Sequence, residues 1–413
     1  MPKRLLFVDD EPMVLEGLRR ALHGMRDEWT MRFANSPAEA LQIMETDSFD
    51  AIISDMRMPG MDGVELLERV KELYSDMIRI ILSGQSKKET ILRSIAPAHQ
   101  FLSKPCNIEE LKQRLGQAFL TRDLLRNQSL ASIISRLRSI PSLPTIYNEL
   151  SNALQSEDTS LVQIERIISK DIGMAAKILQ LANSAFVGAH SHVSSLREAV
   201  SLIGAETVRS LTLSIHVFSQ FDGHCSAAAF LPPLWEHSVA VASLAQRIAN
   251  YETRNKTIAE ECFTAGLLHD IGKIVLLGEM TAEYKQVIHR KDPDTQSFHD
   301  AEVQLVGCPH ELVGAYLMGI WGLPVAIIQA VQFHQLPSET IDSGFSALTA
   351  VHCADAITSE CDHSPLNRDI KLNTEYLNGL QMSHKVDLWR SLHEEYLAAA
   401  ADRNSPSHDK IFA

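Results

Sequence analysis

Short apolar runs alternate with amphipathic segments along the first 120 residues of the chain. The apolar runs have the length of β-strands, and the segments between them carry apolar side chains at helical spacing, as in Val14, Leu18 and Leu22. Five strands are expected, over residues 4–8, 30–34, 51–54, 78–82 and 100–103. Strand–helix alternation of this kind predicts an α/β doubly wound domain, in which helices cover both faces of a parallel sheet.

From about Ser139 the pattern changes to helical periodicity, which continues almost to the C-terminus. Two prolines break the chain there, and one apolar stripe of a helix then follows, formed by Leu161, Ile164, Ile167 and Ile168. Residues 120–138 contain no Gly or Pro and keep an apolar stripe, so we expect them to extend the last helix of the α/β domain. The α/β domain is therefore expected to precede an all-α helical domain.

The expected boundaries divide the chain into five parts. Residues 1–122 form the α/β domain, residues 123–138 a helical linker, and residues 139–340 the main helical domain. Residues 341–401 add a C-terminal helical extension. Residues 402–413 are expected to be a flexible tail, because chain ends with few apolar side chains are seldom ordered.

Composition and charge reduce the number of functions that the sequence allows. With 52 acidic against 38 basic residues the net charge is −14, which argues against a nucleic-acid groove because such grooves need a basic patch. None of the six cysteines forms a Cys-x-x-Cys pair, so reduced thiols are expected. The first apolar run stops at Asp9, and no apolar stretch approaches the length of a membrane span. We therefore expect a soluble, cytoplasmic protein with no membrane partner.

Polar side chains follow four of the expected strands at the point where each strand ends. Asp9 and Asp10 follow the first strand, Asp55 the third, Ser83 the fourth and Lys104 the fifth. Because the carboxyl ends of parallel strands form the ligand crevice of such a sheet, these side chains should converge. Three carboxylates suit Mg²⁺, which neutralises phosphoryl oxygens during transfer to a carboxylate nucleophile. The lysine and the serine hydroxyl can bind the phosphate.

Four motifs in this region carry a family resemblance: Phe7-Val8-Asp9-Asp10-Glu11-Pro12, Ser54-Asp55-Met56-Arg57-Met58-Pro59-Gly60-Met61-Asp62-Gly63, Ile81-Leu82-Ser83-Gly84 and Phe101-Leu102-Ser103-Lys104-Pro105. Over residues 3–122 the chain resembles the receiver (CheY-like) domains of two-component response regulators. The resemblance implies that a sensor histidine kinase is the phosphodonor. It also assigns roles to single residues: Asp55 as phospho-acceptor, Asp9 and Asp10 as Mg²⁺ ligands, Ser83 as switch hydroxyl, Lys104 as phosphate contact and Phe101 as switch aromatic.

A second resemblance covers residues 138–337. It rests on Ile140-Pro141-Ser142-Leu143-Pro144, Leu181-Ala182-Asn183-Ser184-Ala185-Phe186 and Trp321-Gly322-Leu323-Pro324. These motifs resemble HDOD modules of the HD superfamily, which are usually signalling or scaffold units. The resemblance implies an output domain that engages an unknown protein target. Whether residues 120–138 pair in a homodimer stays open, since the apolar repeat there is short and imperfect.

The run Gly266-Leu267-Leu268-His269-Asp270-Ile271-Gly272-Lys273 resembles the signature of HD phosphohydrolases, and further residues follow in the order that those enzymes use. The candidate metal set is His237, His269, Asp270, His310, His334 and Asp355, with Lys273 as a candidate site lysine. Imidazoles and a bridging carboxylate suit a divalent transition metal such as Fe, Mn, Ni or Zn. Such a metal could activate water for phosphoester hydrolysis.

Other interpretations of these histidines stay open. The chain has 17 histidines, and a buried His-Asp pair can hydrogen-bond within a helical bundle without metal. His299-Asp300 is a second such pair, but it lacks the trailing Ile-Gly-Lys and is expected in a loop. Gln335 follows His334 where HD-GYP cyclic-dinucleotide phosphodiesterases usually have a second histidine, and their Gly-Tyr-Pro signature is absent. Hydrolysis of cyclic di-GMP is therefore disfavoured.

Two function classes remain. In the first, the chain is a signalling protein, and phosphorylation of Asp55 changes how the helical domain engages a protein partner. In the second, it is a metal-dependent phosphohydrolase or phosphodiesterase under control of the N-terminal domain. A DNA-binding function is disfavoured, because no basic recognition helix follows Ser139.

Overall fold

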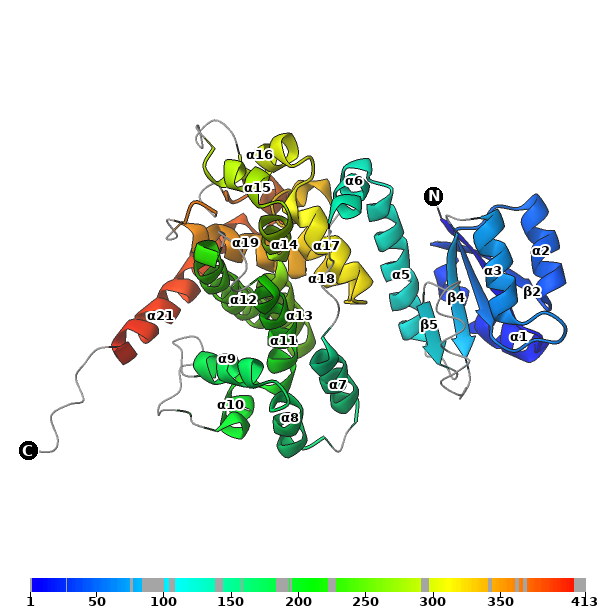
Figure 1. Cartoon of the computed structure of the whole chain (residues 1–413), viewed down its shortest axis with the longest axis horizontal. Coiled ribbons are helices and arrows are strands. Elements are labelled where there is room, and N and C mark those ends of the chain that lie inside the picture. The colour runs from blue at the N-terminus through cyan, green and yellow to red at the C-terminus, as the bar shows by residue number, and fades with distance from the viewer. Residues whose placement is uncertain are drawn as a thin grey trace, which may run out of the picture. The chain divides into compact units, whose positions relative to one another are not determined.

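The chain folds as two compact units, Met1–Arg126 and Asn127–Ala413 (Figure 1). The computed structural model describes residues 2–26, 28–74, 77–83, 100–103, 108–137, 144–156, 159–182, 193, 195–221, 228–290, 297–340, 344–360, 364–366 and 370–404.

The N-terminal unit contains a five-stranded parallel sheet. Its strands are β1 (Lys3–Val8), β2 (Trp29–Ala34), β3 (Ala51–Asp55), β4 (Ile78–Ser83) and β5 (Gln100–Ser103). Every neighbouring pair is parallel, and the spatial order is β2-β1-β3-β4-β5. The predicted parallel sheet is confirmed. The chain order reverses at β1, which has β2 on one side and β3 on the other, so the crevice of the sheet lies at the carboxyl ends of β1 and β3.

Helices cover both faces of this sheet, as its residue pattern predicts. They are α1 (Pro12–Ala21), α2 (Pro37–Thr46), α3 (Gly63–Leu73) and α5 (Ile108–Leu125), with a 3₁₀ turn, η1 (His23–Met25). Leu5 and Phe7 pack in one apolar cluster with side chains of α1 and α5. Leu6 and Val8 point to the opposite face and pack with side chains of α2 and α3. The alternation follows from the two-residue period of a strand.

The C-terminal unit is helical throughout the part that the structure describes, which confirms the predicted all-α domain. No helix in the described part is long and apolar enough to span a membrane. The α-helices are α6 (Gln128–Arg136), α7 (Thr145–Leu154), α8 (Leu161–Ile168), α9 (Ile172–Ala182), α10 (Leu196–Ile203), α11 (Ala205–Phe221), α12 (Leu231–Thr253), α13 (Lys256–Leu268), α14 (Ile271–Glu279), α15 (Thr281–Ile288), α16 (Phe298–Leu305), α17 (His310–Ile320), α18 (Val325–Phe333), α19 (Ala347–Ser359), α20 (Thr374–Gly379) and α21 (Val386–Asn404). The 3₁₀ turns are η2 (Ala228–Phe230), η3 (Pro337–Glu339) and η4 (Ser383–Lys385).

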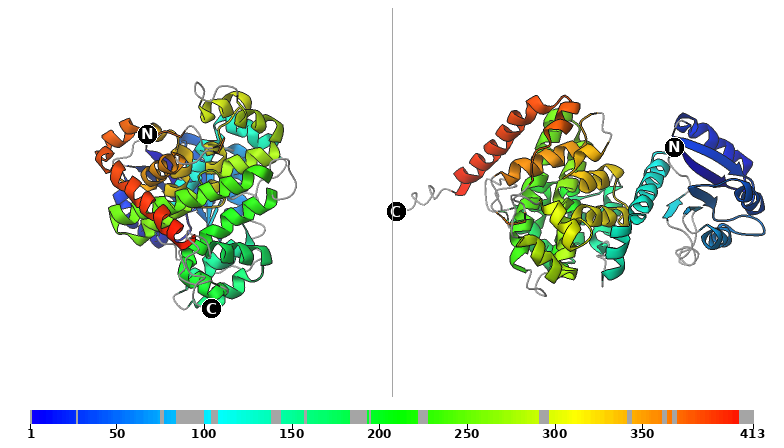
Figure 2. Two further views of the ribbon diagram at one scale, coloured as in Figure 1. Left: turned by 90° about the vertical axis from the view of Figure 1, so that its left-hand side faces the viewer. Right: turned by 90° about the horizontal axis from the view of Figure 1, so that it is seen from above.

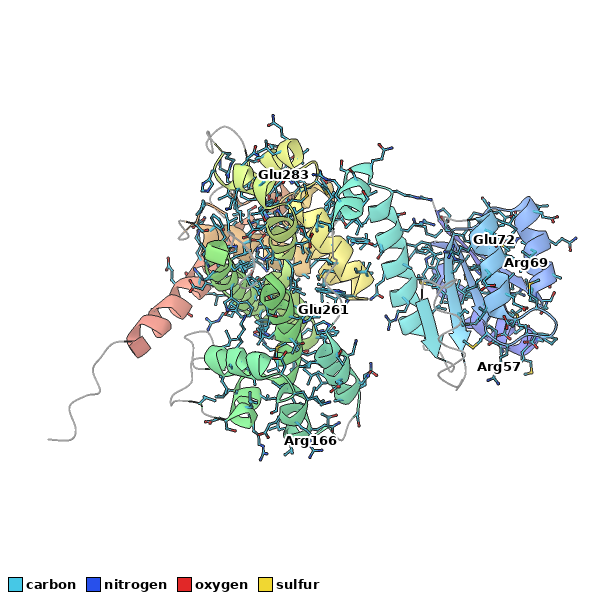
Figure 3. The ribbon with its side chains drawn as sticks, viewed as in Figure 1. Arg57, Arg69, Glu72, Arg166, Glu261 and Glu283 are labelled. Carbon is cyan, nitrogen blue, oxygen red and sulfur yellow. The ribbon has the colours of Figure 1, made fainter. Side chains whose placement is uncertain are left out.

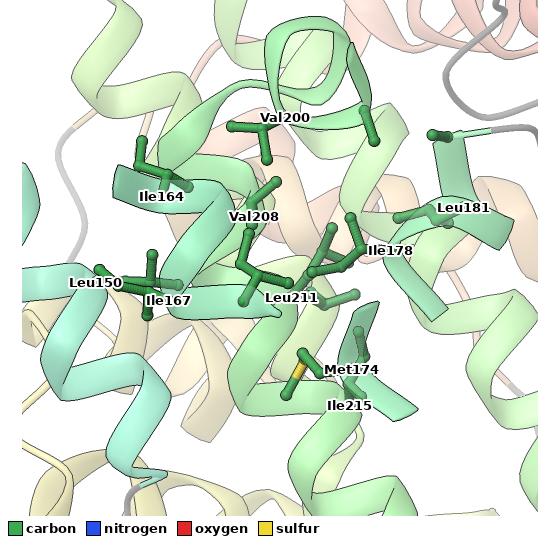
Figure 4. Packing of buried hydrophobic residues seen from close by; sticks show 14 of the residues in the cluster. Leu150, Ile164, Ile167, Met174, Ile178, Leu181, Val200, Val208, Leu211 and Ile215 are labelled. Carbon is green, nitrogen blue, oxygen red and sulfur yellow. The ribbon is translucent and has the colours of Figure 1, made fainter. Parts of the chain in front are cut away.

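Helices α7 to α11 form one lobe of this unit around a shared apolar cluster (Figure 4). Ile164, Ile178 and Val208 come from three of these helices and meet in that cluster. The remaining helices centre on α12, which packs along α13 and α19 (Figures 1 and 2). Ile164, Ile167 and Ile168 of the predicted stripe are buried in the first lobe, whereas Leu161 is 40% exposed.

Two glycines allow helices of the second lobe to approach each other closely. A Cβ atom on Gly266 would lie 2.8 Å from the Cα of Ala242, so α13 rests directly on α12. A Cβ atom on Gly272 would lie 2.0 Å from the carbonyl oxygen of His310, so α14 touches the first turn of α17. The second contact joins the His269–Lys273 motif to His310, which is distant in the sequence.

The predicted continuous helix over residues 120–138 is interrupted. Helix α5 ends at Leu125 and α6 begins at Gln128. Asn127 between them has an extended backbone, and its side chain accepts a hydrogen bond from the backbone N–H of Leu130. Asparagine is a strong N-cap residue, and this bond stabilises a new helix start where neither Gly nor Pro marks a break. The boundary between the two units also falls at this position.

The C-terminal extension contains α20 and α21, and α21 packs beside α12 and α19. In α21 the Trp389 side chain is fully buried, and its indole N–H donates to Glu252 of α12. Helix α21 continues to Asn404, past the position where the tail was expected to begin. The rest of the predicted tail, residues 405–413, lies outside the described residues.

Candidate metal centre and acidic pocket

Two carboxylates lie side by side at the carboxyl edge of the sheet. Asp9 directly follows β1 and Asp55 is the last residue of β3. Val8 pairs with Ser54 across these neighbouring strands, which places Asp9 beside Asp55. The two side chains are only 2% and 8% exposed, whereas Asp10 is partly exposed.

Backbone groups orient both carboxylates. The Asp9 carboxylate accepts a hydrogen bond of 3.0 Å from the N–H of Glu11, and the Asp55 carboxylate accepts one of 2.7 Å from the N–H of Arg57. The Arg57 side chain itself is exposed (Figure 3). Gly63 starts α3 against this loop, and a Cβ atom there would lie 2.0 Å from the Asp55 carbonyl oxygen. A glycine is therefore required at this place in the motif.

For the other residues predicted for this pocket, the structure gives the backbone position or does not describe the residue. Ser83 is the last residue of β4, and Phe101 lies in β5 paired with Ile81. Lys104 lies outside the described residues. The strand ends thus meet as expected, and the side chains described in the pocket are those of Asp9, Asp10 and Asp55.

Six residues of the C-terminal unit converge from separate elements, and we call them the histidine–aspartate centre. They are His237 of α12, His269 and Asp270 between α13 and α14, His310 at the start of α17, His334 after α18 and Asp355 of α19. His237 is 4% exposed, and the other five are at most 1% exposed. All six residues that the sequence selected are therefore in one place.

The facing atoms of the centre lie at the separations expected for ligands of one cation. Asp270 Oδ1 is 3.1 Å from His310 Nε2 and 3.8 Å from His334 Nε2. His269 Nε2 lies 3.6 Å from Asp355 Oδ1, which also lies 2.9 Å from His237 Nε2. A transition metal binds nitrogen and oxygen at about 2.0–2.2 Å, so two ligands of one ion lie roughly 3–4 Å apart.

Several of these atoms are buried without a well-formed hydrogen bond among the described residues. They are His269 Nε2, His310 Nε2, His334 Nε2, Asp270 Oδ1 and Asp355 Oδ2. Leaving one buried polar atom unsatisfied costs about 1–3 kcal/mol, so five such atoms at one point need a common partner. A divalent cation can serve as such a partner for imidazole nitrogens and carboxylate oxygens, and the residues present fit one.

Lys273 closes one side of the centre. Its ammonium group donates to Asp270 Oδ2 at 2.8 Å and to the carbonyl oxygen of Leu366 at 3.2 Å, and the side chain is fully buried. The i, i+3 spacing on α14 brings it to the same face as Asp270, as expected. This bond occupies one oxygen of Asp270 and leaves Oδ1 turned toward the histidines.

The sequence did not indicate a second layer of acidic and aromatic residues behind His310. Glu302 Oε2 accepts from the backbone N–H of His310 at 3.0 Å and from its Nδ1 at 2.7 Å. The Tyr284 hydroxyl donates to Glu302 Oε1 at 2.5 Å. Glu311 accepts from His299 at 2.9 Å, and its other oxygen lies 3.3 Å from His310 Nδ1. The sequence feature that could have identified this layer is the occurrence of Glu302 and Glu311 among apolar residues close to His310.

The expected loop at His299-Asp300 is wrong. Both residues lie in the first turn of α16, where Ser297 caps the helix by accepting from the N–H of Asp300. His299 is directed to Glu311 rather than into the histidine–aspartate centre. Asp300 therefore belongs to the cap of a helix. The absence of a trailing Ile-Gly-Lys correctly distinguished this pair from His269-Asp270.

Buried charges dominate the electrostatics of the centre. Burial by itself lowers the pKa of His269, but Asp270 and Asp355 outweigh it and raise that pKa to about 10. The pKa of His310 also rises to about 10, because the two glutamates outweigh burial. Burial and the neighbouring His269 lower the pKa of His334 to about 4. The carboxylates therefore require positive charge close by, which protons or a metal cation can supply.

Comparisons with known proteins agree with both units. The chain matches the family model for the response regulator receiver domain over residues 5–116 and the model for the HDOD domain over residues 140–337. It is similar to an uncharacterized protein of Treponema pallidum (strain Nichols), with 26% identity over 211 residues, 49% of this chain and 39% of that protein. It is also similar to response regulator MprA of Mycobacterium ulcerans (strain Agy99), with 32% identity over 152 residues, 37% of this chain and 64% of that protein.

Among solved structures, the chain is similar to an HDOD domain protein with unknown function from Geobacter sulfurreducens. The identity is 22%, the match covers 69% of this chain and 99% of that chain, and the TM-score is 0.46. The chain spans 39%, 26% and 64% of the length of the first curated relatives that it matches.

Proposed function

Since this chain is a response regulator that joins a receiver domain to an HDOD domain, we propose that phosphorylation of Asp55 controls how the helical domain engages a protein partner. The observation that carries the proposal is the burial of Asp9 and Asp55 at the ends of adjacent strands. Adjacent carboxylates favour a hard cation such as Mg²⁺, with Asp10 as a further ligand. A receiver domain implies a phosphodonor such as a sensor histidine kinase.

Each residue of the pocket has a distinct role in this proposal. Asp55 is the nucleophile, and the Arg57 N–H fixes the orientation of its carboxylate. Mg²⁺ supplies positive charge for the phosphoryl oxygens, and Asp9 and Asp10 hold it. Three further residues take part as contacts to the phosphoryl group or as switch elements: the Ser83 hydroxyl, the Lys104 ammonium and the Phe101 ring.

Phosphorylation is expected to be lost in Asp55→Asn and kept in Asp50→Asn. Asp50 is a matched control, because it precedes β3 at the opposite end of the same strand and binds Arg122 there. The protein is incubated with acetyl phosphate and Mg²⁺, and intact mass spectrometry counts the phosphoryl groups gained. Wild type and Asp50→Asn should each gain one group that hydroxylamine removes. Equal incorporation in wild type and Asp55→Asn would exclude Asp55 as the acceptor.

For the C-terminal unit we propose that the histidine–aspartate centre binds at least one divalent transition metal, such as Fe, Mn, Ni or Zn. HD domains bind divalent metals, and five converging buried atoms that need a partner support the same role in this chain. When bound, the metal would polarise an attached water molecule. Asp270 and Asp355 would neutralise its charge, and Lys273 would hold Asp270 in place.

The burial of the centre favours a signalling role over phosphoester hydrolysis. His269, Asp270 and Asp355 are at most 1% exposed, and Lys273 bonded to Leu366 covers one side of them, so the described residues leave a phosphoester no direct approach. We therefore expect wild type loaded with Mn²⁺ to show no turnover of bis(p-nitrophenyl) phosphate above the level of Asp270→Asn. Turnover that depends on Asp270 would instead favour the alternative, a metal-dependent phosphohydrolase.

A further inference from the structure

Two of the three converging histidines at helix ends are oriented by their own helix. His269 Nδ1 lies 2.7 Å from the carbonyl oxygen of Gly266, and His334 Nδ1 lies 2.8 Å from that of Val331. Each carbonyl is three residues earlier in the chain, so the last turn of a helix provides it. A ring held through Nδ1 in this way turns Nε2 toward the centre.

His310 cannot be oriented in this way. It is the first residue of α17 and follows Pro309, so no helical turn precedes it. Its backbone N–H is one of the donors that a helix start leaves without an intrahelical partner. Both the ring and the backbone of His310 therefore need an acceptor from another element.

Glu302 of α16 meets both needs with one oxygen. Its Oε2 accepts from the backbone N–H and from Nδ1 of His310, and its Oε1 accepts from the Tyr284 hydroxyl. All three residues are fully buried. Three donors on one carboxylate fix its position and orientation.

We propose that Glu302, held in place by Tyr284, is the positioning residue that directs His310 Nε2 at the metal. The inference rests on the metal-binding function proposed above. A carboxylate behind a ligating imidazole fixes the tautomer and increases the electron donation of the nitrogen that faces the metal. Glu311 is a weaker candidate, because its oxygen is farther from His310 Nδ1, at 3.3 Å, and its other oxygen binds His299.

The test compares metal affinity and ligand field in the full chain. Wild type, Glu302→Gln and Tyr284→Phe are stripped of metal and titrated with Co²⁺ and with Zn²⁺ against a chromophoric chelator. Asp300→Asn is the matched control, because Asp300 is an exposed acidic residue on the same helix. The absorption spectrum of bound Co²⁺ reports changes in its ligands, which a loss of stability alone would not alter.

Glu302→Gln is expected to weaken Co²⁺ and Zn²⁺ binding by about 10–100-fold and to change the Co²⁺ spectrum. Tyr284→Phe should cause a smaller, several-fold loss, and Asp300→Asn no loss. If wild type binds metal while Glu302→Gln keeps its affinity and spectrum, the positioning role is overturned and the metal centre stands. If wild type binds no metal, the metal-binding function itself fails. If Glu302→Gln does not fold, Tyr284→Phe decides, and an unchanged affinity and spectrum there overturns the proposal.

Discussion

Asp270→Asn protein, purified without added metal, is expected to contain no divalent transition metal, whereas wild type should contain at least one ion per chain. Asp270 Oδ1 faces both His310 and His334, so its charge is central to the ligand set. Asparagine preserves the side-chain volume and can still accept from Lys273, so the buried ammonium keeps its hydrogen bonds to residue 270 and to the Leu366 carbonyl. The loss of metal thus reports on the ligand rather than on a disrupted core.

Elemental analysis and thermal melting together measure this effect. A ligand at 100 times its Kd stabilises a folded protein by about 2.7 kcal/mol, so wild type should melt at a higher temperature when Mn²⁺, Fe²⁺, Ni²⁺ or Zn²⁺ is added. Asp270→Asn should show no such shift. Asp300→Asn is the matched control, since it alters the His299-Asp300 pair, which lies outside the centre, and should behave as wild type. Metal-free wild type that does not respond to any of these ions would contradict the prediction.

Gly272→Ala is expected to destabilise the C-terminal unit by about 1–3 kcal/mol, the usual cost of forcing extra atoms into a packed site. The new Cβ would lie 2.0 Å from the His310 carbonyl oxygen, so α14 and the start of α17 must move apart. Glycine to alanine within a helix ordinarily stabilises, by up to about 1 kcal/mol, so the sign of the effect identifies the steric contact. Metal content should fall as well, because the same movement displaces His310.

Thermal melting measures this change, with Gly379→Ala as the control. Apart from its chain neighbours and its own helix backbone, none of the described residues places an atom within 4 Å of a Cβ on Gly379 in α20 of the same unit. A loss of 1–3 kcal/mol corresponds to a melting temperature lower by roughly 2–12 °C in a domain of this size. An unchanged melting temperature and metal content in Gly272→Ala would show that α14 and α17 do not depend on this close approach.

The residues that the sequence could identify were those whose type and position are tied to a local pattern. Asp9 and Asp55 follow apolar strands, and the parallel sheet brings strand ends together. His269 and Asp270 stand in a motif that keeps its Gly and Lys, and the structure gives both a reason: Gly272 permits a helix contact and Lys273 binds Asp270. Such positions can be predicted because their local context already contains their partners.

Glu302 and Tyr284 could not be identified in this way. Each lies in an ordinary amphipathic helix, and its partner belongs to a different helix, so only the packing of α15, α16 and α17 gives it a role. The break at Asn127 was missed for a different reason. Residues 120–138 have good helix-forming composition, and a single N-cap bond outweighed it.

Helix α6 has a consequence for any attempt to transplant or express the output domain alone. It belongs to the C-terminal unit, its Arg136 pairs with Glu283 of α15, and its Leu130 and Ile133 are buried. The HDOD family match begins only at residue 140, so a fragment cut at that match would lose this helix. A fragment that starts just before Asn127 keeps both the helix and its cap. The same point, between Arg126 and Asn127, is the natural junction for exchanging one input domain for another.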